Sequence, residues 1–138
     1  MDQKATMLSK CPLFAGLSER DLAAVSRLAD EVTVRPGKVI TKEGASGHEF
    51  FVILDGKVDI SKAGKRVNTM GPGDFFGELA LLAKVPRMAT VTAATPATLL
   101  VVGHREFTSL LASQPAIRDK VMRALAGWIS ELSGGKTN

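Results

Sequence analysis

Turns divide the middle of the chain into short apolar runs at intervals of about ten residues. Proline fixes its own φ and glycine accepts the backbone angles of tight turns, so such pairs end strands and reverse the chain. The turns are Pro36-Gly37, Asp55-Gly56, Ala63-Gly64 and Gly71-Pro72-Gly73. Short runs rich in Val, Ile, Thr and Phe predict a sandwich or roll of strands. The expected strands are 31–35, 39–43, 50–54, 57–62, 66–70, 90–94 and 97–102.

A helical pattern precedes this strand-rich region. Ser18 and Asp21 have the S-x-x-D spacing of a helix start, and Leu17 and Leu22 are placed to pack together as a hydrophobic staple. We therefore expect helix up to about residue 29. The apolar residues at helical spacing are Leu22, Val25, Leu28 and Ala29.

The helical pattern returns after the strands, from His104 onward. Pro115 marks the first turn of a new helix, and Gly134-Gly135 ends it. We expect two helices here. The first has an apolar stripe of Phe107, Leu110 and Leu111, and the second has one of Ile117, Val121, Leu125, Trp128 and Leu132.

Size and composition favour one globular domain over residues 1–138, made of a helical segment 1–30, a strand region 31–103 and helices in 104–133. Hydrophobic residues make up 45% and charged residues 23%, and no apolar run approaches a membrane span. The N-terminus lacks a signal-peptide pattern, and the single cysteine, Cys11, forms no internal disulfide. We expect a cytoplasmic protein.

Charge and histidine usage argue against two other classes of function. The net charge is +4, but the cations are scattered, so we interpret the basic groups as solvated faces and expect no direct nucleic-acid contact. A cupin-type metal enzyme needs a cluster of histidines and a carboxylate. The two histidines, His48 and His104, are far apart in the sequence. We therefore expect no metal site, no cofactor and no catalytic residues.

One stretch, Phe76–Val91, reads FGELALLAKVPRMATV and carries the strongest indication of function. Gly77 and Glu78 come at the start of a helix-forming run, 79–83, and Arg87 follows nine positions after Glu78. A helix N-terminus and a guanidinium both receive anions well. A carboxylate beside them suits a ligand that also presents a hydroxyl. The combination indicates a sugar phosphate.

This stretch closely resembles the phosphate-binding cassette of the cyclic nucleotide-binding domain family. These are the regulatory modules of cyclic-AMP-dependent kinases, cyclic-nucleotide-gated channels and bacterial cyclic-AMP receptor proteins. The resemblance covers the FGEhAhh half, the PRxATV half and their spacing, and it extends over RPGKVITKEGASGHEFFVILDGKV and MGPGD, from about Leu8 to Leu132. Ala45 departs from the acidic residue found in many members. The resemblance implies a mainly β fold, an eight-stranded β-roll of the jelly-roll type with N-terminal helices, a short phosphate-binding helix and two C-terminal helices.

The resemblance also implies roles for individual residues. Arg87 would bind the exocyclic phosphate, and Glu78 would accept a hydrogen bond from the ribose 2′-hydroxyl. The alternatives are an ordinary surface arginine and a carboxylate that complements the helix dipole. Thr90 is expected to be structural. The backbone N–H groups expected to contact ribose or phosphate belong to Gly77, Leu79, Ala80 and Ala89.

Two further residues bear on the base of the ligand. Family members that prefer cyclic GMP have a hydroxyl residue after the arginine, whereas this chain has Met88, which favours cyclic AMP (cAMP) over cyclic GMP (cGMP). Trp128, the only tryptophan, would stack on the purine as a lid. Its alternative is a place in the core or facing a partner.

These observations favour a sensor without chemistry of its own, in which cAMP binding is transmitted through the C-terminal helices to an unidentified effector. The alternative is a truncated transcription regulator of the cyclic-AMP receptor type, without its helix-turn-helix. A roll that has lost its ligand is opposed by the presence of both Glu78 and Arg87. Oligomeric state is left open, with a homodimer as one option.

Overall fold

The computed structural model describes residues 3–11, 14, 16–77 and 86–134. The helices are α1 (Gln3–Ser9), α2 (Glu19–Ser26), α3 (His104–Ser113) and α4 (Pro115–Gly134). The strands are β1 (Ala29–Val34), β2 (Val39–Thr41), β3 (Glu49–Asp55), β4 (Val58–Lys62), β5 (Lys65–Met70), β6 (Phe75–Phe76), β7 (Thr90–Ala93) and β8 (Ala97–Gly103).

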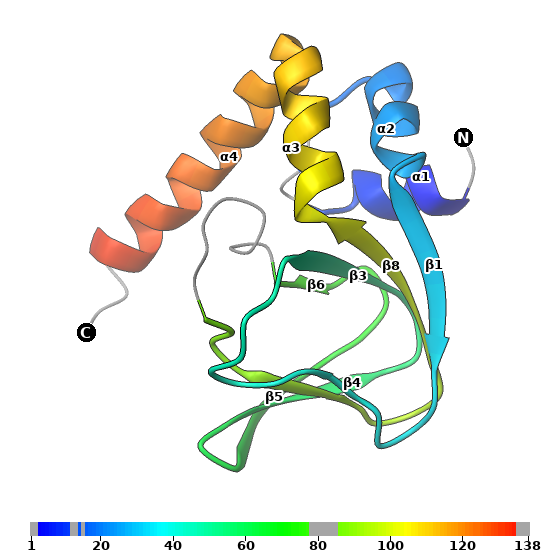
Figure 1. The fold of residues 1–138 in the computed structure, drawn as a ribbon, viewed down its shortest axis with the longest axis vertical. Helices are drawn as coiled ribbons and strands as arrows, with labels where there is room; N and C mark the ends of the chain where they lie inside the picture. Colours follow the sequence, from blue (N-terminus) through cyan, green and yellow to red (C-terminus); the bar gives the residue numbers. More distant parts are fainter. Residues whose placement is uncertain (1–2, 12–13, 15, 78–85, 135–138) are drawn as a thin grey trace.

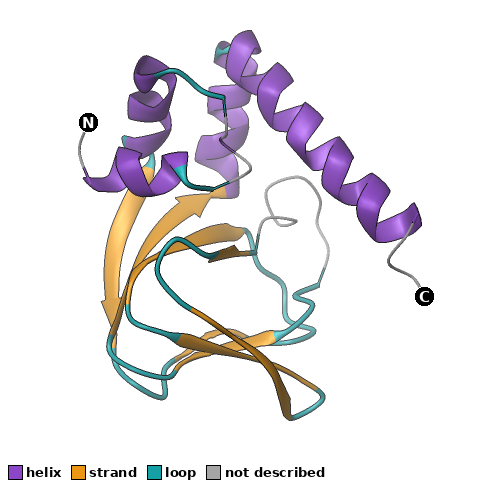
Figure 2. Ribbon diagram, turned by 180° about the vertical axis from the view of Figure 1, so that it is seen from behind, coloured by secondary structure: helices purple, strands orange, loops and turns teal. Residues whose placement is uncertain are grey.

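The strands form two antiparallel sheets of four, in the orders β1-β8-β3-β6 and β2-β7-β4-β5. The helices gather at one end of this roll, with α1, α2 and α3 over the ends of β1 and β8 (Figure 1). Seen from behind, α4 runs outward from the same end (Figure 2). The predicted fold class, a mainly β roll of eight strands with helices at both ends of the chain, is confirmed.

Strand β3 separates two hydrophobic cores because its side chains alternate between faces. Phe50, Val52 and Leu54 point to the helices, where they pack with residues of α1, α2, β8, α3 and α4. Phe51 and Ile53 point into the roll and pack with residues of β4, β6, β7 and β8. One strand therefore forms a wall shared by the helical core and the roll core.

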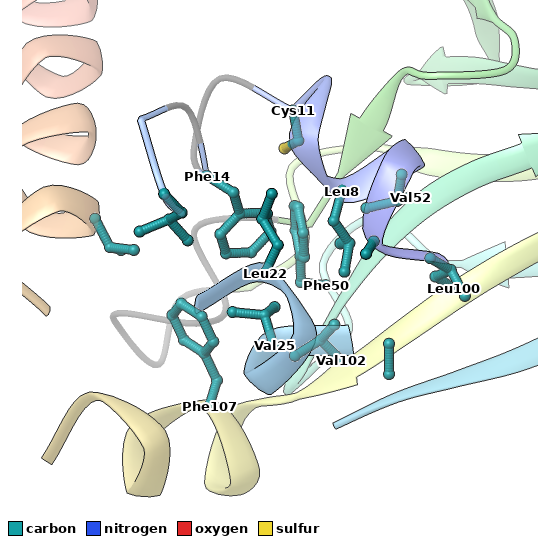
Figure 3. Packing of buried hydrophobic residues seen from close by; sticks show 14 of the residues in the cluster. Leu8, Cys11, Phe14, Leu22, Val25, Phe50, Val52, Leu100, Val102 and Phe107 are labelled. Carbon is teal, nitrogen blue, oxygen red and sulfur yellow. The ribbon is translucent and has the colours of Figure 1, made fainter. Parts of the chain in front are cut away.

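Phe14 is the centre of the helical core. It is 1% exposed, and its ring meets those of Phe50 and Phe107 edge-on, with 6.0 Å between ring centroids in each case. Figure 3 shows it packed against Leu22 and between these two rings. The N-terminal segment is thereby tied to both β3 and α3.

The predicted helix starts at Ser18 and Pro115 are confirmed, and so are the described parts of the apolar stripes. The side chains of Leu125, Trp128 and Leu132 lie outside the described residues. Ser18 is the N-cap of α2 and its Oγ accepts a hydrogen bond from the Asp21 N–H at 3.1 Å. Ile117 and Val121 of the second C-terminal stripe are fully buried. None of the described helices is long and apolar enough to cross a lipid bilayer.

Two features of the structure differ from expectation, and one expectation is not tested. The helical pattern was predicted to reach Ala29, but α2 ends at Ser26 and Ala29 begins β1, where it is buried in the same core from a strand. Apolar spacing alone does not distinguish these two ways of burying Ala29. The two-residue strand β6 was too short to be predicted separately. The expected helix over residues 79–83 lies outside the described residues.

Candidate functional site

Arg87 is fixed at the level of its backbone by the loop that follows β2. The Arg87 N–H donates to the Ala45 carbonyl at 2.9 Å, and the Gly44 N–H donates to the Arg87 carbonyl at 2.8 Å. Arg87 thus pairs with two successive residues rather than with one, as in a β-bulge. The residue after Pro86 is therefore held in register with residues 44–45, just before β7 begins.

The guanidinium of Arg87 lies in a slot formed by β3, Gly47 and Gly77. Its Nη1 donates to the backbone carbonyl of Glu49 at 3.0 Å. Its carbon Cζ lies 5.7 Å from the centroid of the Phe51 ring, within the range of a cation–π contact. Phe51 in turn stacks on Phe76, with 4.8 Å between the ring centroids. Aromatic residues of the roll core thus pack against the charged group.

Two glycines give the guanidinium its space. A Cβ on Gly47 would coincide with Nε, Cζ and Nη2 of Arg87. A Cβ on Gly77 would come within 2.8 Å of both Arg87 Nη1 and the Glu49 carbonyl. Gly77 also has a φ of 81°, a left-handed conformation that side chains disfavour. Any larger residue at these two positions would displace the arginine.

The electrostatic surroundings of Arg87 are mixed. The side chain is half-buried, and this burial lowers the pKa of Arg87 while the negative charge of Glu49 partly opposes the decrease. Within the described residues, no ion pair joins Arg87 to a carboxylate. The guanidinium has five N–H donors in a fixed fork. Donors other than the one given to Glu49 can therefore receive an oxyanion.

Hydroxyl groups of β2 and β7 hold the flanking backbone. Thr90 Oγ1 accepts from the Glu43 N–H at 3.0 Å, and the Glu43 carboxylate accepts from the Ala63 N–H at 2.9 Å. Thr41, only 7% exposed, donates from Oγ1 to the Ala89 carbonyl at 3.3 Å. The hairpin turn between β4 and β5 is thereby connected to the segment that carries Arg87.

The structure brings together Gly77 and Arg87 among the predicted site residues. Ala89 and Thr90 follow Arg87 and are partly buried, whereas Met88 is 62% exposed. Thr90 makes the structural hydrogen bond described above. Glu78, Leu79 and Ala80 lie outside the described residues, and so does the side chain of Trp128 on α4.

Sequence reasoning missed the residues that line the slot of Arg87. Gly47 was included only in a stretch resembling the family, and Glu49 and Phe51 were given no role. The sequence cannot indicate that the Glu49 carbonyl, rather than its side chain, receives the guanidinium. The alternation of β3, with Phe51 inward and Phe50 toward the helices, was the available signal.

The two histidines are neighbours in the fold although they are distant in the sequence. The His104 N–H donates to the His48 carbonyl at 2.7 Å, next to the pairing of Glu49 with Gly103. In the part of the chain that the structure describes, no three His, Cys, Asp or Glu residues gather as a metal site would require. The chemistry available at Arg87 is anion binding.

A family model and several curated proteins match this chain. A family model described as the cyclic nucleotide-binding domain matches residues 31–114. A cyclic nucleotide-gated potassium channel from Mesorhizobium japonicum is 36% identical over 113 residues, which cover 82% of this chain and 31% of the channel. A cAMP-dependent protein kinase regulatory subunit from Yarrowia lipolytica is 36% identical over 109 residues, covering 75% and 28%.

Solved structures of related proteins have a fold similar to that of this chain. The N-terminal domain of a transcriptional regulator from Streptomyces coelicolor has a TM-score of 0.88 and 29% identity, and the match covers 96% of each chain. The regulatory domain of Toxoplasma gondii PKA, solved with cAMP, has a TM-score of 0.72 and 34% identity, covering 78% of this chain and 43% of that one. The chain spans about three tenths of the length of the curated relatives it matches.

Proposed function

This chain belongs to the cyclic nucleotide-binding domain family, and we propose that it binds cAMP as a regulatory sensor. The observation that carries the proposal is the half-buried guanidinium of Arg87, which lies against Gly47, Gly77 and Phe51 and donates to one carbonyl oxygen among the described residues. A charged group taken partly out of water binds an anion more strongly than an exposed one does. In this proposal the cyclic phosphate binds at Arg87, and Glu78 accepts from the ribose 2′-hydroxyl.

The preference for cAMP rests on Met88. This side chain is exposed and has no hydroxyl to hydrogen-bond with the edge of a guanine. A base whose polar edge stays unpaired on binding loses affinity. The relative from Toxoplasma gondii that was crystallised with cAMP supports the same ligand class.

Transmission to an effector is the second part of the proposal. The roll core beneath Arg87 and the helical core beneath α3 and α4 lie on opposite faces of β3. If β3 has two arrangements and the ligand binds one of them more tightly, binding favours that arrangement and shifts the position of the helices packed on β3. Emission from Trp128, the only tryptophan, would report on α4 directly.

Calorimetric titration with cAMP and cGMP, side by side, tests the proposed function. We expect cAMP to bind and cGMP to bind more weakly. The 2′-deoxy analogue of cAMP should bind much more weakly than cAMP itself, because Glu78 loses its hydroxyl partner. Absence of binding by both cyclic nucleotides would overturn the proposal.

A second candidate is the sensor part of a transcription regulator. The regulator domain from Streptomyces coelicolor that matches nearly the whole chain favours it. This candidate shares the ligand and differs in the output, which would be a helix-turn-helix. Sequencing the native transcript beyond Asn138 distinguishes them, since a following helix-turn-helix would assign the regulator and any other effector would exclude it.

A further inference from the structure

Glu49 lies beside Arg87, and its carboxylate has no role in the function proposed above. Its backbone carbonyl accepts the hydrogen bond from Nη1 at 3.0 Å. Alternation along β3 puts its side chain on the same face as Phe51, the residue whose ring Arg87 covers. The side chain of Glu49 therefore starts on the face of β3 where the guanidinium lies.

The Glu49 carboxylate is exposed and forms no ion pair with Arg87 in the described part of the chain. Its charge nevertheless acts on the guanidinium, because it raises the pKa of Arg87 against the effect of burial. It is thus a negative charge near the anion site that, among the described residues, forms no ion pair with the arginine fork. Any anion bound at Arg87 would experience this charge as repulsion.

We propose that Glu49 is a specificity-determining residue that selects singly charged phosphodiesters over doubly charged phosphomonoesters at Arg87. The inference rests on the proposed function, because it assumes that the phosphate binds at Arg87. The ligands in question are the cyclic nucleotide and its hydrolysed form, the nucleoside 5′-monophosphate. Discrimination between them would let a sensor respond to the cyclic ligand alone.

The physical basis is the product of the charges. A cyclic phosphodiester carries one negative charge, whereas a phosphomonoester carries about 1.5 to 2 near neutral pH. Coulomb energy is proportional to that product, so a carboxylate at the same distance repels the monoester up to about twice as strongly. If removal of the carboxylate improves binding of the monoanion by some factor, binding of the dianion improves by about the square of that factor.

The test is Glu49→Gln, which keeps the backbone carbonyl and the size of the side chain. We expect calorimetry at about pH 7.5 and low salt to give about threefold tighter binding of cAMP and about tenfold tighter binding of 5′-AMP. The ratio of the two dissociation constants then falls about threefold. At about 1 M salt, where the Debye length is about 3 Å, the change in this ratio should largely disappear.

Asp55→Asn is the matched control. Asp55 is an exposed carboxylate on the same strand, six residues and about 20 Å along β3, so the same change of charge should leave the ratio unchanged. If Glu49→Gln does not fold, Glu49→Thr serves instead, because strands accept threonine readily.

The possible failures are distinguishable. Normal cAMP binding with an unchanged ratio in the Glu49 variant would overturn the role of Glu49 alone. An equal shift in Asp55→Asn would also overturn it, since the effect would then be one of net charge. Absence of cAMP binding by the unmodified chain would overturn both this inference and the proposed function.

Discussion

Arg87 combines a partly buried charge, a paired backbone and guanidinium donors that no described carboxylate takes. Its backbone is paired with residues 44–45 and its Nη1 with the Glu49 carbonyl. Side-chain entropy is therefore lost on folding, before any ligand arrives. Such preorganisation lets the arginine contribute strongly to affinity.

Arg87→Ala is expected to weaken cAMP binding at least about thirtyfold. Removing one member of a desolvated charge pair costs about 2–5 kcal/mol, and 2 kcal/mol corresponds to about thirtyfold. The free energy of unfolding should change little, because the substitution removes the partly buried cation itself and so leaves no unpaired charge in the slot. Calorimetric titration measures the first effect and urea denaturation the second. Unchanged affinity would remove Arg87 from the site.

Gly47→Ala should also weaken cAMP binding, although Arg87 itself is not substituted. Its Cβ would occupy the position of the guanidinium, and the flexible end of Arg87 would move away rather than the backbone. We expect at least about tenfold weaker cAMP binding, equivalent to about 1.4 kcal/mol, with little change in the urea midpoint.

Gly71→Ala is the control for that substitution. The nearest atom to a Cβ at Gly71 is the Gly56 carbonyl oxygen at 4.0 Å, which is ordinary van der Waals contact. The Gly71→Ala variant should bind cAMP with the affinity of the unmodified chain. Equal affinities for both alanine variants would contradict the positioning role of Gly47.

At the scale of elements, α2 illustrates how much a local pattern decides. Ser18 caps the helix, and Leu22 and Val25 then bury its inner face. The S-x-x-D spacing predicted this start because it depends only on residues within one turn. The end of the helix depends on β1, which pairs with β8 some seventy residues later, and no local pattern contains that pairing.

Ser18→Ala should lower the free energy of unfolding by about 1 kcal/mol, the usual cost of losing an N-cap. Ser109→Ala is the matched control, since Ser109 is exposed within α3 and alanine favours helix. Chemical denaturation followed by circular dichroism measures both. An equal effect of the two variants would mean that the cap hydrogen bond contributes nothing.

The candidate site shows the same division between local and long-range information. The FGE and PRxAT halves of the cassette indicated Gly77 and Arg87, and the fold brings these two residues together. Gly47, Glu49 and Phe51 reach Arg87 from β3 and the loop before it. Their roles depend on register between distant segments, which a single sequence does not specify.

At the scale of the whole molecule, β3 divides the chain into a ligand side and a helix side. Phe51 and Phe76 stack beneath Arg87 in the roll core. Phe14, Phe50 and Phe107 form the centre of the helical core. Stability should therefore respond to the aromatic residues of both cores, whereas ligand affinity should respond mainly to those of the roll core.

Substitution of one phenylalanine on each side tests this division. Phe14→Leu and Phe76→Leu both remove a buried ring, so each should lower the free energy of unfolding by about 1–3 kcal/mol. Only Phe76→Leu disturbs the support of Phe51, where an aromatic pair contributes about 0.5–1.5 kcal/mol. We expect it to weaken cAMP binding about three- to tenfold, and Phe14→Leu to change the dissociation constant by less than about threefold. Urea denaturation and calorimetry on the same samples measure both quantities. If Phe14→Leu weakened binding as much as Phe76→Leu, the two cores would act as one, and β3 would not separate the ligand from the helices.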